Sequence, residues 1–212
     1  MRACRDARTV VASMEVQLHT FLFADISSYS VLTEREGDEA AAELAISFSE
    51  EVERLAAACG ASVVRRIGDG VMVHCLNAAD AIALGLQLVR ADHGRPAVHA
   101  GVHSGPALSR ADDWWGATVN VTSRVAAVAR AGELLVTEHA RRAAGAAPHG
   151  ELSALGAIRL RNVSEPVSVY SSRPPRRGLL TSLADLRLRA GRLLDDVADR
   201  GLGRQGLRAD VS

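Results

Sequence analysis

An Asp-Gly pair between two runs of β-branched and apolar residues constrains the fold of this chain more than any other feature. The pair is Asp69-Gly70, and valine, isoleucine and methionine dominate the residues on both sides of it. An Asp-Gly pair in this setting is typical of a β-hairpin with a tight turn that requires positive φ. The sequence therefore predicts hairpin strands over residues 62–67 and 71–76, with Asp69 at the tip.

A second apolar run, predicted as a strand over residues 17–26, ends on another aspartate, Asp25. If the two segments are neighbours in one sheet, two carboxylates meet at its edge. Close carboxylates repel each other, and a shared divalent cation such as Mg²⁺, bound together with substrate phosphates, is the usual resolution. The pattern indicates phosphate chemistry on bound metal. The alternative is that Asp69 serves only as a turn residue.

Length and charge exclude several classes of protein. The 212 residues suit one well-buried domain with appendages. The 25 lysines and arginines balance the 25 aspartates and glutamates, so no global field attracts nucleic acid or an anionic membrane. No apolar run reaches the length of a membrane span, and the N-terminus lacks the continuous apolar segment of a signal peptide.

The three cysteines, Cys4, Cys59 and Cys75, are widely spaced and include no Cys-x-x-Cys pair. This usage argues against a disulfide framework or a zinc site and favours a reducing compartment. We therefore predict a cytoplasmic protein. Cys75 lies within an apolar run, which predicts a small core residue there.

The other hydrophobic patterns predict helices that alternate with strands. Apolar residues at spacings of three and four predict a long helix over residues 38–58. His99 and His103 fall on one side of a later strand, and we assign them no chemistry. The order is typical of an α/β sandwich in which helices cover a mixed sheet. The further elements are helix 78–91, strand 97–102, loop 109–116, helix 117–130, strand 133–136, helix 138–144, and strands 158–161 and 167–171.

The two ends of the chain are predicted to lie outside the α/β sandwich. Residues 1–16 are predicted to be a loose leader, residues 17–172 the domain, and residues 173–178 a Pro/Arg linker. Over residues 179–200, leucines and other apolar residues recur at spacings of four and three. This pattern predicts an amphipathic helix that packs on the domain or pairs with a second copy. Residues 201–212 are predicted to be a disordered tail.

Five stretches of the chain carry a family resemblance when they are taken together, namely FLFADI, RIGDGVM, GVHSG, WGATVNVTSR and GELLVT. In this order they are similar to motifs of the class III nucleotidyl cyclases, the adenylate and guanylate cyclases. The resemblance covers residues 17–172. It implies the nucleotidyl cyclase fold, a ferredoxin-like mixed β-sheet covered by helices.

The resemblance implies a metal site and a reaction. Asp25 and Asp69 match the two metal-binding aspartates of the family, and the backbone carbonyl of Ile26 matches a further ligand. The implied cofactors are two divalent cations, Mg²⁺ or Mn²⁺. The implied reaction is attack of a ribose 3′-hydroxyl on the α-phosphate, which releases pyrophosphate and closes a 3′,5′-cyclic phosphate.

Three further residues match family positions that contact the substrate. Asn120 and Arg124 are four apart on a predicted helix and match the pair that orients the ribose and meets charge on the α-phosphate. Without the motif, both would be ordinary helix-surface residues. Arg161 stands where the family usually has a lysine for the terminal phosphates, and a guanidinium also binds phosphate.

The positions that match the family's purine-selecting pair carry Arg65 and Asp113. Asp113 suits the exocyclic amine of adenine as an acceptor, and Arg65 suits a ring nitrogen as a donor. ATP is therefore favoured over GTP. Arg65 departs from the usual lysine, because a planar guanidinium replaces a compact ammonium.

The resemblance also implies a homodimer with composite active sites, in which the metal aspartates come from one protomer and Asp113, Asn120 and Arg124 from the other. The first hypothesis is an adenylate cyclase. A cyclase-like module that is catalytically silent and binds a nucleotide or a protein is the alternative, and guanylate cyclase activity is a third possibility that Asp113 argues against.

Overall fold

The computed structural model describes residues 17–91, 96–111, 113–146 and 152–173. The predicted leader, the 179–200 helix, the tail and the linker beyond residue 173 lie outside the described residues. The described elements are β1 (Leu18–Ile26), α1 (Tyr29–Glu36), α2 (Asp38–Ala58), β2 (Ser62–Ile67), β3 (Gly70–Cys75), α3 (Ala78–Arg90), β4 (Val98–Pro106), β5 (Leu108–Arg110), β6 (Asp113–Trp115), α4 (Ala117–Val128), β7 (Leu134–Thr137), α5 (Glu138–Ala143), β8 (Ser153–Ile158) and β9 (Val167–Ser171).

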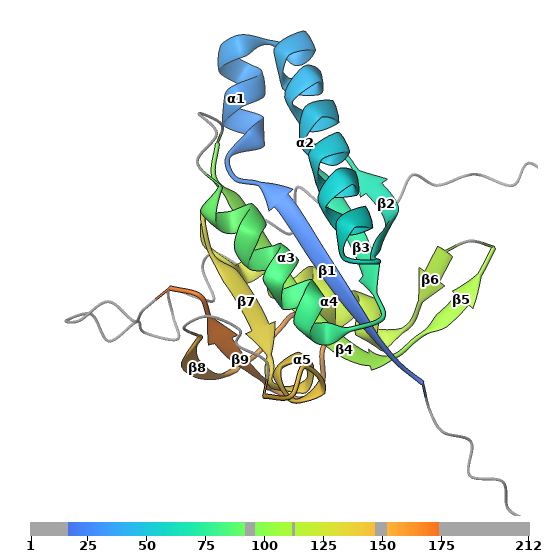
Figure 1. The fold of residues 1–212 in the computed structure, drawn as a ribbon. Coiled ribbons are helices and arrows are strands. Elements are labelled where there is room, and N and C mark those ends of the chain that lie inside the picture. Colours follow the sequence, from blue (N-terminus) through green and yellow to red (C-terminus); the bar gives the residue numbers. More distant parts are fainter. Residues whose placement is uncertain (1–16, 92–95, 112, 147–151, 174–212) are drawn as a thin grey trace, which may run out of the picture.

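A mixed sheet forms the centre of the fold. Its seven strands lie in the order β2-β3-β1-β4-β7-β9-β8. β1 pairs antiparallel with both β3 and β4, while β4 and β7 run parallel. Helices α2 and α3 pack on one face and α4 on the other (Figure 1). The predicted α/β sandwich with a mixed sheet is confirmed.

Alternation along β1 explains the two layers. Leu22, Ala24 and Ile26 are buried in the cluster under α2 and α3. Phe21 instead packs with Val119 of α4 on the opposite face. Because successive side chains of a strand point to opposite faces, Asp25 is placed on the α4 face of the sheet.

Two glycines of β4 allow α4 to lie close to the sheet. A Cβ atom on Gly101 would lie 2.4 Å from the backbone nitrogen of Ala126, and one on Gly105 would lie 2.6 Å from Thr118 Oγ1. Real Cβ atoms do not approach other atoms so closely, so only glycine fits at either position in this packing. The strand thereby fixes the height of the helix that carries Asn120 and Arg124.

The structure corrects the predicted hairpin turn. Ile67 pairs with Gly70, so the two central residues of the turn are Gly68 and Asp69 rather than Asp69 and Gly70. Gly68 supplies the positive φ, at 59°. Glycine at the first central position is typical of a type II′ hairpin turn. Asp69 remains at the tip, as predicted.

Two other predictions were wrong in the C-terminal half. The segment predicted as a loop over residues 109–116 contains the β5–β6 hairpin, in which Leu108 pairs with Trp115. The strand predicted at 158–161 is β8, which lies earlier, at Ser153–Ile158. Four of its six residues are exposed, so the apolar pattern that marks a buried strand is absent.

None of the helices among the described residues combines the length and apolar character that a membrane span requires.

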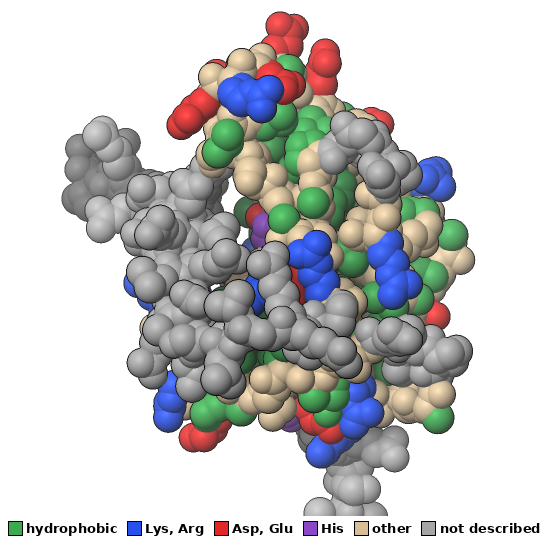
Figure 2. Space-filling model, turned by 90° about the vertical axis from the view of Figure 1, so that its left-hand side faces the viewer, with side chains coloured by type: hydrophobic (Ala, Val, Ile, Leu, Met, Phe, Trp, Pro, Cys, Tyr) green, Lys and Arg blue, Asp and Glu red, His purple; other side chains and the backbone are tan. Residues whose placement is uncertain are grey.

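Acidic side chains gather at the tip formed by the end of α1 and the start of α2 (Figure 2). Cys75 is buried, as predicted, and burial raises the pKa of its thiol to about 12.

Burial of His103 predicts sensitivity to acid. Its ring is buried against Thr137, with Nδ1 2.8 Å from the threonine Oγ1. Burial is the main cause that lowers the pKa of His103 from 6.5 to about 4, and the nearby His139 contributes to the shift. Between these two pH values the unfolded chain binds a proton that the folded chain does not, so stability falls as the pH falls. For His103 alone, the free energy of unfolding should drop by about 2 kcal/mol between about pH 7 and about pH 5. His99, whose pKa burial also lowers to about 4, should add a comparable drop.

Urea unfolding at the two pH values checks this expectation. His103→Gln keeps a hydrogen-bonding partner for Thr137 and removes the titration, so its stability should depend less on pH than that of the parent protein. Equal pH dependence in the two proteins would contradict the assignment to His103.

Candidate active site

The carboxylate of Asp25 lies near the C-terminal end of β1, beside a glycine. Asp25 pairs with Gly70 across β1 and β3, and a Cβ atom on Gly70 would lie 3.1 Å from Asp25 Oδ1. The backbone nitrogen of Ile26 donates to the same oxygen at 3.1 Å. The side chain of Asp25 is 35% exposed, so it remains accessible to a ligand. The missing side chain at Gly70 makes room for this carboxylate.

Pairing of β1 with β3 also brings Asp69 to this end of the sheet, since Asp69 immediately precedes Gly70 in the turn. The hypothesis of a shared cation required the two strands to be neighbours, and they are. Asp69 is partly exposed and makes no hydrogen bond or ion pair with the other described residues.

These donors fit a hard divalent cation. Two carboxylates and the carbonyl of Ile26 offer only oxygen atoms, which Mg²⁺ and Mn²⁺ prefer. Among the described residues, no group of three or more His, Cys, Asp and Glu side chains could hold a metal ion. A site with so few protein ligands is typical of Mg²⁺ that is bound jointly by carboxylates and substrate phosphates.

His99 lies behind Asp25, and sequence reasoning assigned it no role. Its Nε2 is 3.9 Å from Asp25 Oδ2, and its Nδ1 is 3.1 Å from Ser27 Oγ. Burial lowers the pKa of His99 to about 4, so the ring is neutral near pH 7 and the contact with Asp25 is not an ion pair. A neutral imidazole at this distance leaves the negative charge of the carboxylate available to a cation. Only the pairing of β4 with β1 reveals this neighbour.

Helix α4 carries the next two predicted residues on its accessible side. Thr118 and Thr122 are buried toward the sheet, whereas Asn120 is exposed and Arg124 is half-buried. The spacing of four residues places Asn120 and Arg124 one above the other on the helix. Both side chains are therefore available to a ligand.

Arg161 is exposed in the turn that follows β8. The next residue, Asn162, adopts a left-handed conformation with φ of 56°. Asparagine tolerates this region better than most residues, which allows a tight turn at Arg161. Arg161 was predicted at the end of a strand and is instead on a loop.

Arg65 and Asp113, the two residues predicted to select the purine, contact each other. Arg65 Nη2 donates to Asp113 Oδ2 in an ion pair. The guanidinium of Arg65 also lies over the ring of Trp115, 5.6 Å from its centroid. The structure thus brings together residues that are 48 positions apart in the sequence.

A bulge in β2 aims Arg65 toward the hairpin. Val63 pairs with Val73, but Arg65 pairs with Met72, so Val64 is an extra residue in the strand. Met72 packs on the α4 face, and opposite residues of an antiparallel pair share a face. The bulge therefore moves Arg65 to the face on which Asp113 lies.

The hairpin has a second anchor beside this pair. Trp114 lies against two histidine rings, with its ring centroid 4.3 Å from those of His19 and His74. The two imidazoles are joined by a 3.1 Å contact between His19 Nδ1 and His74 Nε2. Burial lowers both pKa values, and the neighbouring His19 lowers that of His74 further. Sequence reasoning missed this cluster because its members come from three separate strands.

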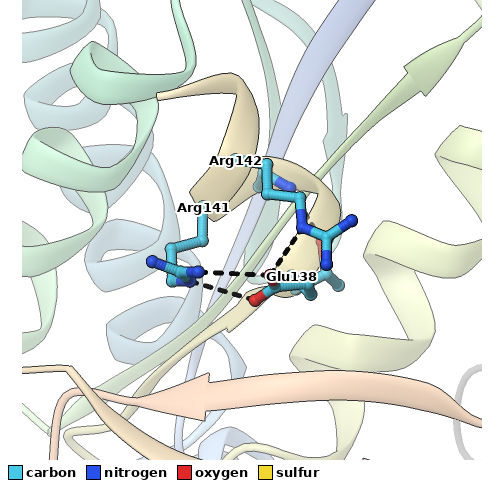
Figure 3. A network of polar contacts seen from close by, with 5 residues as sticks. Glu138, Arg141 and Arg142 are labelled. Carbon is cyan, nitrogen blue, oxygen red and sulfur yellow. Dashed lines mark hydrogen bonds and ion pairs between the residues drawn. The ribbon is translucent and has the colours of Figure 1, made fainter. Parts of the chain in front are cut away.

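A polar network at α5 stands apart from these residues. Arg141 and Arg142 both donate to Glu138, and the Arg142 Nε to Glu138 Oε1 distance is 2.6 Å (Figure 3). Hydrogen bonds from Arg141 are the main cause that lowers the pKa of Glu138 to about 2. The guanidinium of Arg141 lies over Tyr170 of β9, 4.8 Å from the ring centroid. The network joins α5 to β9 and is structural.

Comparison with known protein families identifies the domain. The family model of the adenylate and guanylate cyclase catalytic domain matches residues 11–170. The chain belongs to this family. The resemblance seen in the sequence motifs is thereby confirmed, and Asp25, Asp69, Asn120 and Arg124 all lie within the matched residues of this cyclase domain.

Curated relatives of the cyclase domain include bacterial adenylate cyclases. It is 40% identical over 116 residues to a pH-sensitive adenylate cyclase of Mycobacterium tuberculosis. This alignment covers 52% of this chain and 29% of the relative. It is 33% identical over 117 residues to an adenylate cyclase of Streptomyces griseus. That alignment covers 54% of this chain and 29% of the relative. The matched segment thus spans under a third of the length of each of these two relatives.

Solved structures share the fold. Adenylate cyclases of Trypanosoma brucei in their monomeric state superimpose with a TM-score of 0.67 at 21% identity, over 73% of this chain and 89% of theirs. An adenylyl cyclase of P. aeruginosa superimposes with a TM-score of 0.61 at 21% identity, over 76% of this chain and 96% of its own. These likenesses confirm the predicted nucleotidyl cyclase fold.

Proposed function

We propose that this domain is an adenylate cyclase that converts ATP to 3′,5′-cyclic AMP and pyrophosphate. The observation that carries the proposal is the register of β1 with β3, in which Asp25 pairs with Gly70, the residue that follows Asp69 in the hairpin turn. Adenylate cyclases among the relatives support the same reaction. In this reaction a bond forms between the 3′-oxygen and the α-phosphorus, the bond from the α-phosphorus to the bridging oxygen breaks, and the 3′-hydroxyl proton leaves.

Asp25 and Asp69, with the Ile26 carbonyl, would hold two divalent cations, Mg²⁺ or Mn²⁺. When bound, these cations supply charge neutralisation for the triphosphate and acidify the 3′-hydroxyl. His99 lies beside the Asp25 carboxylate, with Nε2 3.9 Å from Oδ2, and the missing side chain of Gly70 leaves room for that carboxylate.

Residues on the accessible side of the fold would contact the nucleotide. Asn120 orients the ribose, and the permanently charged Arg124 meets negative charge that develops on the α-phosphate. Arg161, exposed in its turn, binds the terminal phosphates. Arg65 and Asp113 read the purine, with a donor for a ring nitrogen and an acceptor for the exocyclic amine. This arrangement favours adenine, since the amide NH of guanine would face the cation of Arg65.

We infer that the active form is a head-to-tail homodimer. The aspartates of one protomer would then face Asn120 and Arg124 of the other, so that each of two equivalent sites draws on both copies. Such sites make activity depend on protein concentration, because a dissociated protomer lacks half of each site.

Mixing two inactive variants tests the composite site. Asp69→Asn and Arg124→Ala should each be inactive alone, whereas an equal mixture should regain about a quarter of the parental activity, because half of the dimers are mixed and each mixed dimer has one intact site. The measurement is cyclic AMP production from ATP, with GTP as a parallel substrate. Asp69→Asn mixed with Asp25→Asn is the control and should stay inactive, since both changes affect the same half-site.

The outcomes separate the hypotheses. Recovery in the first mixture alone supports the dimeric adenylate cyclase. No cyclic nucleotide from the folded parental protein with either substrate and either metal would overturn the enzyme proposal in favour of a silent binding module. Cyclic GMP as the main product would overturn the assignment of adenine to Arg65 and Asp113.

A further inference from the structure

The ion pair between Arg65 and Asp113 joins the main sheet to the two-stranded β5–β6 hairpin. Arg65 lies on β2, an edge strand of the main sheet, and Asp113 begins β6 of the two-stranded hairpin. Their side chains are 38% and 25% exposed, so the pair is accessible to solvent and to a ligand. The hairpin extends away from the body of the sheet (Figure 1).

Each charge of this pair is occupied by the other. The guanidinium of Arg65 donates to Asp113 and lies over the ring of Trp115, a residue that is 55% exposed. Asp113 Oδ1 accepts from the backbone nitrogen of Trp114 at 2.8 Å, so the carboxylate is held in one orientation by its own strand. The two polar groups that would read a purine are therefore engaged with each other.

We propose that Arg65, Asp113 and Trp115 form a latch that keeps the hairpin against β2 and that an adenine base must open. Adenine presents an acceptor and a donor side by side, so it can receive a hydrogen bond from Arg65 and give one to Asp113 once the two side chains separate. Opening removes the guanidinium from the face of Trp115. The bulge at Val64 is the local device that aims Arg65 at the hairpin, because regular alternation would place Arg65 on the opposite face.

The surroundings make such a latch reversible. Partly exposed ion pairs contribute little to stability and are screened by salt, so a ligand that offers two hydrogen bonds can compete with the pair. Trp114 holds the hairpin through its contacts with His19 and His74, independently of the latch. The hairpin is thus anchored at one point while the other opens. The opening by nucleotide rests on the proposed function, but the latch itself does not.

Tryptophan fluorescence tests the latch directly, because the only two tryptophans of the chain, Trp114 and Trp115, both lie in this hairpin. In Trp114→Phe, the signal comes from Trp115 alone. Arg65→Gln or Asp113→Asn in that background should raise the open-to-closed ratio about threefold, the range expected for loss of an exposed ion pair. Acrylamide quenching of Trp115 should increase accordingly. High salt should act in the same direction on the parent. The matched control is Arg66→Gln, because Arg66 pairs with Glu53 and not with the hairpin.

The charge-reversed double variant, Arg65→Asp with Asp113→Arg, separates the latch from base recognition. It should re-form an ion pair between β2 and the hairpin, detected as salt-sensitive quenching of Trp115 that the two single variants lack, and it should lose adenine preference, since donor and acceptor are exchanged. 3′-DeoxyATP with Mg²⁺, which lacks the attacking hydroxyl, should increase quenching of Trp115 in the parent more than 3′-deoxyGTP does. If Trp114→Phe does not fold, ¹⁹F resonances of the full chain labelled with 5-fluorotryptophan give the same readout.

The results distinguish failure of the latch from failure of the proposed function. Unchanged quenching in Arg65→Gln and Asp113→Asn would overturn the latch even if the protein makes cyclic AMP. A latch that opens on mutation but not with 3′-deoxyATP, in a protein that makes cyclic AMP, would overturn the coupling to adenine. Opening by 3′-deoxyATP without any cyclic nucleotide production would support the latch and contradict the cyclase.

Discussion

Asp69→Asn is expected to reduce cyclic AMP production by about a thousandfold or more while the domain stays folded. Asparagine keeps the size of the side chain and is well suited to a turn, so the hairpin should form as before. It removes one of the two negative charges proposed to hold the divalent cations. A loss of several kcal/mol in stabilisation of the transition state corresponds to this decrease, because each 1.36 kcal/mol changes the rate tenfold.

A second aspartate provides the control for Asp69→Asn. Asp80 lies in the first turn of α3, which follows the end of β3, at the opposite end of that strand from Asp69. Asp80→Asn should retain nearly full activity. Binding of Mn²⁺ in the presence of ATP, followed by electron paramagnetic resonance, should weaken only in Asp69→Asn. A variant at Asp69 that keeps more than about a tenth of the activity would exclude this residue from the metal site.

The sequence predicted the centre of the fold because its signals there are local and strong. The 3.6-residue period predicted α2 with the bounds that the structure shows, Asp38–Ala58. The apolar run that ends at Asp25 and the one that follows Asp69 predicted β1 and β3, and these two strands pair with each other. Their signal is clear because both strands are largely buried. A buried element with a clear hydrophobic period can be predicted from its own sequence, without knowledge of its neighbours.

Elements at the margin of the fold were less predictable. β5 and β6 have three residues each and are mostly exposed, so no alternation marks them. The bulge at Val64 leaves no trace in the pattern, because the valines and arginines of β2 fit a regular strand equally well. Consequently the direct contact of Arg65 with Asp113 could not be inferred from the sequence pattern, although the family resemblance named both residues as one purine-selecting pair. The same holds for His99, whose role depends on its partner across β4 and β1.

The accurate prediction of the aspartate strands and the poor prediction of the purine-reading elements both follow from where these residues lie in the fold. The aspartates stand at the ends of buried strands, whereas the purine-reading residues stand on an edge strand and a short hairpin. Edge elements have fewer neighbours that fix their position, and function concentrates in such segments. The proposed latch accordingly involves the part of the domain that sequence patterns describe least well.

Gly101→Ala is expected to have the largest effect on stability. The new Cβ would lie 2.4 Å from the backbone nitrogen of Ala126 and 2.9 Å from the carbonyl carbon of Val125, so the clash is with the backbone of α4 and not with a side chain that can rotate. The helix must move away from the sheet. We expect the free energy of unfolding to fall by about 3 kcal/mol, at the upper end of the usual cost of overpacking. Urea unfolding followed by far-ultraviolet circular dichroism measures it.

The neighbouring glycine supplies a matched comparison that isolates this cause. A Cβ on Gly105 would meet the side-chain oxygen of Thr118 at 2.6 Å, so Gly105→Ala should be relieved by Thr118→Ala in the double variant. No side-chain truncation on α4 can relieve Gly101→Ala in the same way. Because α4 carries Asn120 and Arg124, the shifted helix should also lower the rate of cyclic AMP formation in protein that remains folded. Full stability and activity in Gly101→Ala would show that α4 does not depend on this close approach to β4.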